Sequence, residues 1–247
     1  MRRYLVGVGT LLVLLATVTA NADPDALRAH LAEEYPDFSV DSIEPAPLEG
    51  LYEVVSGAEV MYISADGRYV LRGELLDLVA GRNLTSEVQQ QLSHQQVEAL
   101  GEENMVVYEP AGGEVEHQIT VFTDTTCGYC QELHQEVLAA IDRHGIELRY
   151  LMFPRAGLGS RAAETLRDIW CADDPQAAMT AAKRGESVPA RDSSCNPPVA
   201  EHFETGQQIG VTGTPYILLN DAGPVFAGYR PVEQLIEMSR ESGGLRE

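Results

Sequence analysis

The sequence contains very little positive charge, and almost none of it comes from lysine. Lys183 is the only lysine, and together with sixteen arginines it gives 17 basic side chains against 38 acidic ones, a formal net charge of −21. Binding to nucleic-acid phosphates or to an anionic membrane surface requires a contiguous patch of lysine and arginine. The composition therefore excludes nucleic acid as a partner and argues against adsorption to an anionic membrane.

Long apolar runs are also scarce, and the clear one lies at the N-terminus. Arg2 and Arg3 precede an apolar stretch over 5–18, and small residues around Ala22 follow it. This stretch is shorter than the roughly 20 residues that a membrane-spanning helix needs, and its flanks are typical of a secretory signal peptide. We predict a signal peptide over 1–22, cleaved after Ala22, and no membrane insertion. Loss of two arginines then takes the charge from −21 to −23, and the mature chain enters a compartment that permits disulfides.

Residues 23–84 have the pattern of a small unit that contains both helix and strands. Leu27 and Leu31 recur at helical spacing, and short stretches of alternating apolar residues follow. The predicted elements are a helix that ends before Pro36 and strands over 51–55, 59–64 and 69–71, the last two joined in a hairpin.

A unit of about sixty residues buries little apolar surface and is marginally stable alone. Its C-terminal part carries an apolar group made of Leu75, Leu76, Leu78 and Val79. Pairing with a second copy of the chain would bury these side chains, and so would packing within one chain. The pattern by itself leaves both arrangements open.

A linker helix is predicted over 85–103, with Thr85 as its N-cap and Val88 as the first residue of its apolar stripe. The remaining residues, 104–247, have an α/β pattern. The predicted elements are a strand over 119–123, a helix over 130–143 ending at Gly145, a strand over 146–153, a helical insertion over about 155–207, strands over 216–219 and 224–227, and a helix from Pro231. Strand, helix and strand at this spacing predict one βαβ unit with a parallel pair.

Only four cysteines are present, too few for a protein built around disulfides, so their spacing is more informative than their number. Cys127 and Cys130 lie directly after a predicted strand and at the start of a helix. Free backbone N–H groups and the helix dipole favour a thiolate there, so the pKa of Cys127 is expected to be low. We predict that Cys127 attacks a disulfide and that Cys130, about one turn further on, resolves the mixed disulfide.

Other functions of this cysteine pair fit less well. A c-type haem site needs histidine after the second cysteine, where the chain has Gln131. A structural zinc site needs a second close pair of ligands, so no metal is expected. A purely structural bridge over two residues gains little loop entropy. Thiol-disulfide chemistry therefore remains the favoured interpretation.

Cys171 and Cys195 are expected to form a structural disulfide in an exported protein, and a second redox pair is the alternative. Closing a loop of about 24 residues would remove roughly 3–4 kcal/mol of unfolded-state entropy in the chain model. Near the first pair, Asp124 is interpreted as a polar turn residue and His134 as a solvated surface histidine, although either could affect Cys127. For Thr214–Pro215, the residues alone predict an ordinary trans peptide.

Five separated motifs resemble the DsbC/DsbG family of periplasmic thiol:disulfide interchange proteins, in the thioredoxin superfamily. They are the runs over 121–130 and 150–157, the triplet 169–171, the run over 210–215 and the pair Gly228-Tyr229, with 44–47 as a further match. The resemblance implies an α+β protein: a cystatin-like N-terminal dimerisation domain (23–84), a linker helix (85–103) and a thioredoxin-like catalytic domain (104–247) with a helical insertion.

The resemblance also implies roles for individual residues. Cys127 and Cys130 would be catalytic, and Cys171 and Cys195 would form the structural disulfide. The residues implied in substrate binding are Gly128, Tyr129, Thr214 and Pro215, with a cis peptide before Pro215. The strand beginning near Gly73 would lie in a homodimer interface.

The implied function is a periplasmic disulfide isomerase and reductase with chaperone activity and no cofactor. Its clients would be unfolded or misoxidised exported proteins, and the membrane reductase DsbD would supply electrons. The alternative is a DsbG-like chaperone and reductase that protects single thiols of folded clients; relatives of that kind typically have Pro-Tyr where this chain has Gly128-Tyr129. The N-terminal unit argues against a dedicated oxidant like DsbA.

Overall fold

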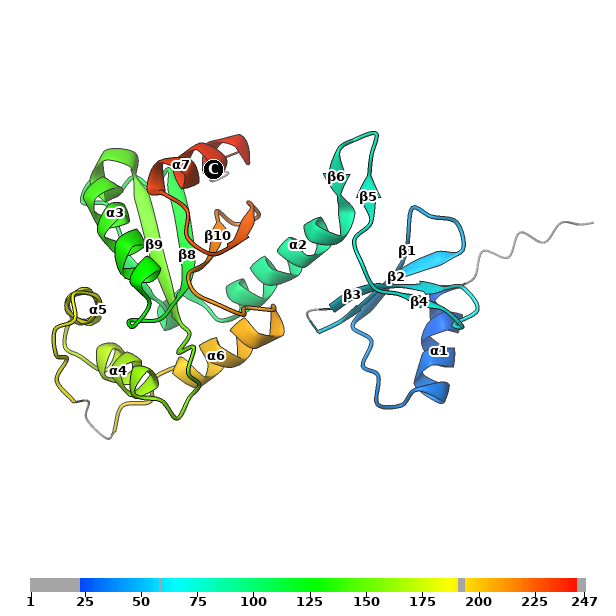
Figure 1. Cartoon of the computed structure of the whole chain (residues 1–247), viewed down its shortest axis with the longest axis horizontal. Coiled ribbons are helices and arrows are strands. Elements are labelled where there is room, and N and C mark those ends of the chain that lie inside the picture. Colours follow the sequence, from blue (N-terminus) through cyan, green and yellow to red (C-terminus); the bar gives the residue numbers. More distant parts are fainter. Residues whose placement is uncertain (1–22, 58, 191–193, 244–247) are drawn as a thin grey trace, which may run out of the picture.

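The computed structural model describes residues 23–57, 59–190 and 194–243. The predicted signal peptide and its cleavage site after Ala22 lie outside these residues. Within them, no helix is both long enough and apolar enough to cross a membrane. Figure 1 shows two units, with one long helix running between them.

The N-terminal unit is a helix packed on an antiparallel sheet. Asp23 caps the helix by accepting a hydrogen bond from the backbone of Asp25, and Pro24 occupies its first turn, where its missing N–H costs nothing. The elements are α1 (Pro24–Glu34), β1 (Ser42–Pro45), β2 (Leu51–Ser56), β3 (Glu59–Ser64) and β4 (Val70–Leu71), with the strands in the order β1-β2-β3-β4. The core consists of Leu27, Leu31, Ile43, Tyr52, Val54, Met61 and Ile63. The helix and the three predicted strands are present, and β1 was not predicted.

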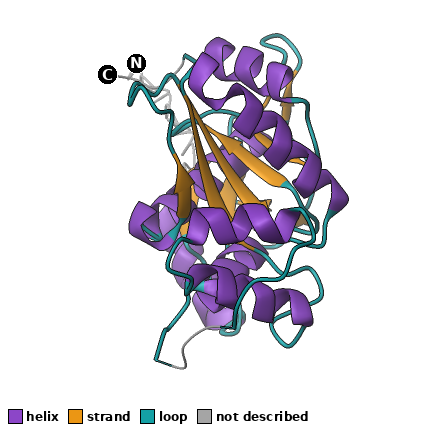
Figure 2. Ribbon diagram, turned by 90° about the vertical axis from the view of Figure 1, so that its left-hand side faces the viewer, coloured by secondary structure: helices purple, strands orange, loops and turns teal. Residues whose placement is uncertain are grey.

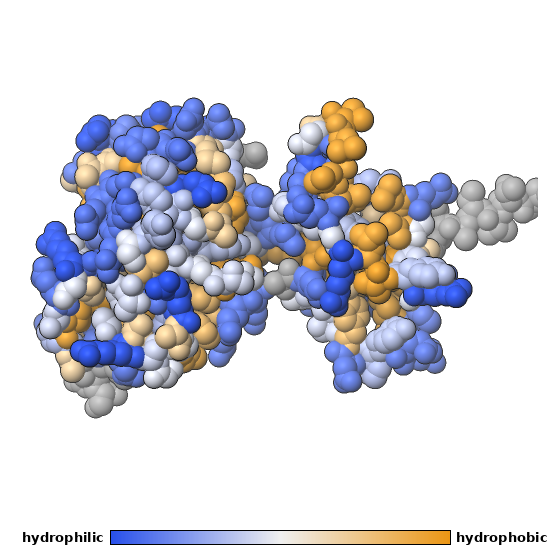
Figure 3. Space-filling model, viewed as in Figure 1, coloured by the Kyte–Doolittle hydropathy of each residue, from blue (hydrophilic) through white to orange (hydrophobic). Residues whose placement is uncertain are grey.

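A short hairpin follows, made of β5 (Leu76–Asp77) and β6 (Arg82–Asn83). Leu78 and Val79 at its tip are 86% and 101% exposed. Leu76 is also exposed, so most of the apolar group identified in the sequence does not pack within the chain. Figure 3 shows this apolar surface on the N-terminal unit.

The helix between the units, α2 (Leu84–Ala99), is capped by Asn83, whose side chain accepts a hydrogen bond from the backbone of Ser86. The prediction of Thr85 as the cap was wrong. Thr85 is buried, and its hydroxyl bonds to the Tyr62 hydroxyl at 2.6 Å and accepts from the backbone N–H of Leu75 at 2.8 Å. Because the buried Thr85 hydroxyl is occupied by these tertiary hydrogen bonds, it does not cap the N-terminus of the helix.

The C-terminal unit is built on a five-stranded sheet in the order β11-β10-β8-β9-β7. The strands are β7 (Val106–Tyr108), β8 (His117–Thr123), β9 (Ile146–Met152), β10 (Tyr216–Leu219) and β11 (Val225–Ala227). Strands β8 and β9 are parallel, as predicted, and the other neighbours are antiparallel. The edge strand β7 was not predicted, because three residues are too short to show a period.

Helices cover both faces of this sheet (Figure 2). They are α3 (Gly128–His144), α4 (Arg161–Trp170), α5 (Pro175–Lys183), α6 (Val199–Gln208) and α7 (Val232–Glu241), and a short 3-10 turn spans Glu102–Asn104. One apolar cluster includes residues of α3, α5 and α7. The other joins Val97 and Leu100, at the end of α2, to Phe122 and Leu151 of the sheet. The linker helix is therefore packed onto the C-terminal unit.

Candidate active site at the start of helix α3

Cys127 and Cys130 lie where the sequence predicts, between the end of β8 and the first turn of α3. Cys127 is the N-cap residue of α3, and the backbone N–H of Gln131 donates to its carbonyl at 3.0 Å. Leu133 and Val137 bury the inner face of the helix. Both cysteines are free thiols. The apolar stripe of α3 therefore fixes the pair at the positive end of the helix dipole.

Cys127 lies just beneath the surface and faces the start of β10. It is 3% exposed, while its neighbours Thr126 and Gly128 are exposed. Its thiol donates to the carbonyl of Thr214 at 3.2 Å, and the Thr214–Pro215 peptide bond is cis, as the family resemblance implies. The structure thus brings together Cys127, Cys130 and the Thr214–Pro215 segment.

The two thiols differ in how readily they ionise. Burial opposes ionisation of Cys127, but hydrogen bonding with Thr214 and with Cys130, together with the charge of Arg155, outweighs it, so the pKa of Cys127 is lowered. For Cys130, which is fully buried, burial dominates, and its pKa is raised although the charge of Lys183 opposes the shift. Cys127 therefore ionises more readily than Cys130.

Asp124 is a turn residue, as predicted, and it is buried, with 1% of its surface exposed. One carboxylate oxygen accepts from the backbone N–H and the hydroxyl of Thr126 at 2.8 and 2.7 Å. The other accepts from the backbone N–H of Arg155 at 2.9 Å and lies 3.5 Å from its Nε. Asp124 thereby holds the turn before Cys127 and keeps Arg155 beside it.

The prediction of His134 as a solvated surface histidine was wrong. It is 2% exposed, with Nδ1 at 2.9 Å from the Tyr150 hydroxyl and Nε2 at 3.1 Å from the Thr180 hydroxyl. Burial and the nearby charges of Lys183 and Arg184 lower the pKa of His134 to about 3, so the ring is neutral at physiological pH. It sits on the α3 face that α5 covers, and helical periodicity alone did not reveal the polar network there.

Sequence reasoning missed the role of Lys183, although its being the only lysine was a signal. Lys183 is 2% exposed, and its Nζ donates to the Thr123 hydroxyl at 2.7 Å. Nζ also lies 4.8 Å from the centre of the Tyr150 ring, a cation–π contact. Burial lowers the pKa of Lys183 to about 8, while the two cysteines and Asp124 act to raise it.

Two tyrosines form an exposed platform beside the cysteines. Tyr129 is 61% exposed and stacks on Tyr229 with ring centroids 5.7 Å apart. The Tyr229 hydroxyl donates to Glu136 at 2.7 Å, and this hydrogen bond fixes the position of the Tyr229 ring. A rigid aromatic surface next to a reactive sulfur is suited to contact with the side chains of another polypeptide.

Cys171 and Cys195 form a disulfide, as predicted, with their Cα atoms 6.0 Å apart. It joins the C-terminal end of α4 to the segment that precedes α6. The bridge therefore closes the helical insertion beside the site without contributing a free thiol.

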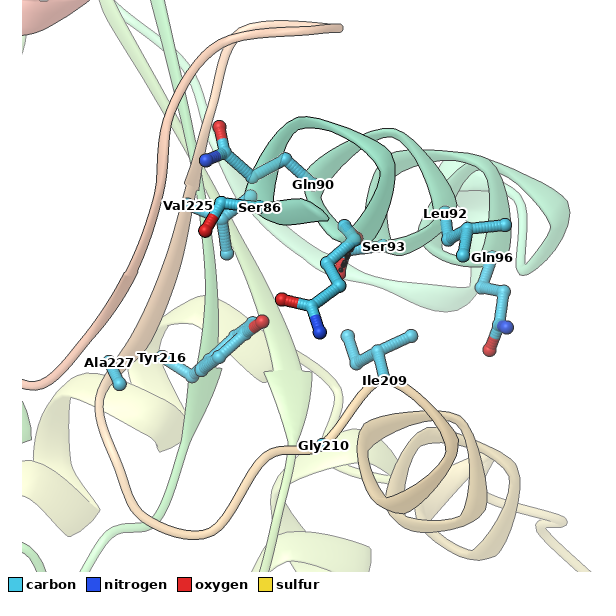
Figure 4. Close-up of a pocket in the computed structure, with 11 residues that line it drawn as sticks. Ser86, Gln90, Leu92, Ser93, Gln96, Ile209, Gly210, Tyr216, Val225 and Ala227 are labelled. Carbon is cyan, nitrogen blue, oxygen red and sulfur yellow. Dashed lines mark hydrogen bonds between the residues drawn. The ribbon is translucent and has the colours of Figure 1, made fainter. Parts of the chain in front are cut away.

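A separate pocket of about 330 Å³ lies between α2 and the C-terminal unit (Figure 4). Gln90, Ser93 and Gln96 line one side, and Ile209 and Tyr216 line the other. Neither Cys127 nor Cys130 lines this pocket.

Comparison with known proteins follows the same division of the chain. Residues 18–86 match the family described as "Disulfide bond isomerase protein N-terminal domain", and residues 105–242 match "Thioredoxin-like domain". The thiol:disulfide interchange protein DsbC of Escherichia coli K12 is 37% identical over 235 residues, covering 94% of each chain. The Salmonella typhimurium DsbC is 38% identical over 228 residues, covering 92% of this chain and 91% of the relative.

Among solved structures, a disulfide interchange protein from Neisseria gonorrhoeae aligns with a TM-score of 0.49 and 29% identity. That alignment covers 57% of this chain and 96% of the other. The curated relatives, by contrast, match over nearly the whole chain, across both the N-terminal unit and the thioredoxin-like unit.

Proposed function

The chain belongs to the DsbC family of thiol:disulfide interchange proteins, and from that premise we propose that it rearranges incorrect disulfides in exported proteins as a periplasmic homodimer. The observation that carries the proposal is the inequality of the two thiols. The pKa of Cys127 is lowered and that of Cys130 is raised, although the two residues are only three chain positions apart at one helix end. An attacking sulfur must be ionised and within reach of a client; the lowered pKa of Cys127 favours the first condition, and its exposed neighbours Thr126 and Gly128 favour the second.

The reaction begins when the Cys127 thiolate attacks one sulfur of a client disulfide. The client S–S bond breaks, a Cys127–client disulfide forms, and the released client sulfur takes up a proton. A second client thiolate then attacks the client sulfur of this mixed disulfide. A new client disulfide forms, Cys127 leaves as a thiolate, and no net oxidation or reduction occurs.

If no client thiol arrives, Cys130 attacks Cys127 and releases the client. The enzyme then holds a Cys127–Cys130 disulfide and the client has gained two electrons. Net isomerisation therefore needs a donor that keeps the pair reduced, and we assign this role to a membrane reductase of the DsbD type.

The client binds beside Cys127 on a surface formed by Gly128, the Tyr129–Tyr229 platform and the Thr214–Pro215 segment. The backbone of Thr214 faces the reactive sulfur at 3.2 Å. An extended client segment can pair with this backbone without regard to its sequence, as in other modes of strand addition. This backbone pairing would accept clients of many sequences and would hold each of them at a fixed distance from the Cys127 sulfur.

Dimerisation would proceed through the apolar surface of the N-terminal unit. Strand β4 is the last strand of its sheet, and its Val70 and Leu71 are 54% and 53% exposed. Leu78 and Val79 of the β5–β6 hairpin are exposed as well, and exposed apolar side chains gathered on one unit are of a kind that marks protein interfaces.

Insulin reduction and refolding of a scrambled disulfide protein, run side by side on the mature chain, test the proposal. We expect activity in both, a dimer in light scattering, and loss of both activities in Cys127→Ser. A double Leu78→Glu, Val79→Glu variant should be monomeric and should keep insulin reduction while losing most refolding activity. Insulin reduction without any refolding activity in the dimer would contradict an isomerase.

Chaperone activity accompanies this function and depends on the surface that binds clients rather than on the thiols of Cys127 and Cys130. The variant that lacks both Cys127 and Cys130 should still suppress aggregation of a reduced client that has no disulfides to exchange. Loss of that suppression in a correctly folded dimer would limit the protein to redox chemistry.

A further inference from the structure

The single lysine of the chain is buried under the active site at the C-terminal end of α5. Removing a charged ammonium from water is costly unless an opposite charge or several hydrogen bonds compensate for it. Lys183 is 2% exposed, and among the described residues its Nζ donates a hydrogen bond to Thr123. Among the described residues, no carboxylate lies within ion-pair distance of its Nζ. Within the described part of the chain, the cation therefore has a hydrogen-bond acceptor but no ion-pair partner.

The other groups around Lys183 do not supply that partner. From α3, His134 is neutral because burial lowers its pKa to about 3. From β9 and β7, the hydroxyls of Tyr150 and Tyr108 have raised pKa values and remain protonated. Arg184, the next residue, is an exposed cation.

The buried carboxylate of the turn after β8 is committed elsewhere. Asp124 is already occupied by hydrogen bonds from Thr126 and Arg155. The group left to face the ammonium is the Cys130 thiol, on the α3 turn that α5 packs against. An anion on Cys130 would lie in a dry site opposite one positive charge, where Coulomb attraction is strong.

We propose that Lys183 is a positioning residue for the release step: through Thr123, its ammonium stabilises the thiolate of Cys130 as that sulfur attacks the Cys127–client disulfide. This inference rests on the proposed function, because the release step exists only if Cys127 forms mixed disulfides. The geometry explains why a lone cation is kept in the core. The charge on Cys130 that it stabilises appears only during turnover.

In this step Lys183 keeps its proton. Nζ donates to the Thr123 oxygen, so the hydroxyl hydrogen of Thr123 is free to turn towards Cys130. The Cys130 proton ends on the departing client sulfur, the Cys127–client bond breaks, and the Cys127–Cys130 bond forms. Two electrons pass from the cysteine pair to the client, and the oxidised site then contains no anion on either cysteine.

Rapid mixing of the reduced full chain with a limiting amount of the disulfide dithionitrobenzoate separates the two steps. Attack by Cys127 releases the first coloured thiolate, and attack by Cys130 releases the second in a first-order phase. The variants are Lys183→Met, which removes the charge at similar length; Lys183→Arg, which keeps it; and Arg184→Met, which removes the neighbouring exposed charge as a matched control.

We expect Lys183→Met to slow the second phase about tenfold at pH 7, the effect of one pKa unit on Cys130. The first phase should change by much less, and Arg184→Met should change neither. Lys183→Arg should restore most of the rate if the larger side chain is accommodated. A second phase in Lys183→Met within twofold of the parent overturns the inference, whereas absence of the first phase in the parent overturns the proposed function instead.

A second measurement does not depend on whether the arginine of the Lys183→Arg variant fits in the site. In the Cys127→Ser chain, Cys130 is the remaining free thiol, and its ionisation is followed by thiolate absorbance against pH. Adding Lys183→Met should raise the pKa of Cys130 by about one unit or more. A merely structural lysine would leave that pKa unchanged. The Lys183→Met chain should stay folded, because burial of a charge without an ion-pair partner is itself unfavourable.

Discussion

Cys127 and Cys130 begin α3 as free thiols, whereas Cys171 and Cys195 tie the end of α4 to the segment before α6 by a disulfide. The first pair closes a loop of only two residues and gains little entropy from oxidation, so its redox state is governed by the charges and hydrogen bonds around each sulfur. The second pair spans 24 positions and constrains the unfolded chain. The same side chain is reactive in one place and structural in another because of what surrounds it.

Among the variants that test this comparison of the two cysteine pairs, loss of the attacking thiol of the reactive pair should have the largest effect. Cys127→Ser is expected to lower disulfide rearrangement by at least about a thousandfold, because no other group supplies the nucleophile. Cys130→Ser is the matched control: it should lose net insulin reduction but retain some refolding of scrambled protein through client thiols. Residual refolding in Cys127→Ser comparable to that of Cys130→Ser would show that the two sulfurs are equivalent.

Removal of the structural pair should affect stability and not chemistry. The Cys171→Ser, Cys195→Ser double variant is expected to lose roughly 3–4 kcal/mol of unfolding free energy, the value for a loop of this length in the chain model. Urea unfolding measures the loss, and initial rates of insulin reduction at low temperature should stay within about twofold of the parent. A folded variant with no activity would place this pair in the reaction.

The pH dependence of alkylation should sharpen the difference within the reactive pair. Because the pKa of Cys127 is lowered and that of Cys130 raised, the rate of reaction with iodoacetamide should fall off at a lower pH in Cys130→Ser than in Cys127→Ser. The reduced chain also gains folding stability from Cys127 above the unfolded thiol pKa, and loses it as pH falls through the lowered folded value. Identical alkylation profiles in the two variants would refute the assignment of roles.

The smallest expected effect concerns Arg155, whose charge is the last of the influences on Cys127. Its side chain is 44% exposed, so solvent and salt screen it. Arg155→Gln should raise the pKa of Cys127 slightly and slow alkylation at pH 7 by about twofold at low salt, with the difference vanishing near 1 M salt. A change that persists in salt would mean that Arg155 acts through the turn at Asp124.

Sequence reasoning was most successful where a period or a motif coincides with backbone geometry. The strand predicted over 119–123 and the helix predicted over 130–143 are both present, and the thiol of Cys127 lies between them as expected. The left-handed Gly145, with φ of 56°, ended that helix as predicted. These features depend on residues that are close together in the chain, so the local sequence is enough to predict them.

The errors involved side chains whose partners come from distant elements. Thr85 was taken for a cap because its bond to Tyr62 cannot be seen along the chain, and Asn83 performs that role. His134 was placed in solvent because α5, which buries it, lies in the insertion. The composition shows that Lys183 is the only lysine, but its place near Cys130 depends on the packing of α5 on α3, which the local sequence does not predict.

The helix α2 is fastened at both of its ends. Thr85 in its first turn bonds to Tyr62, His94 donates to the carbonyl of Gly223 at 2.8 Å, and Val97 packs into the sheet of the C-terminal unit. Its 16 residues set a separation of about 24 Å and also an angular phase, since each residue turns the helix by about 100°. Inserting one residue would therefore swing Cys127 to another side of the molecule relative to the hairpin tip at Val79, while leaving every bond within the site unchanged.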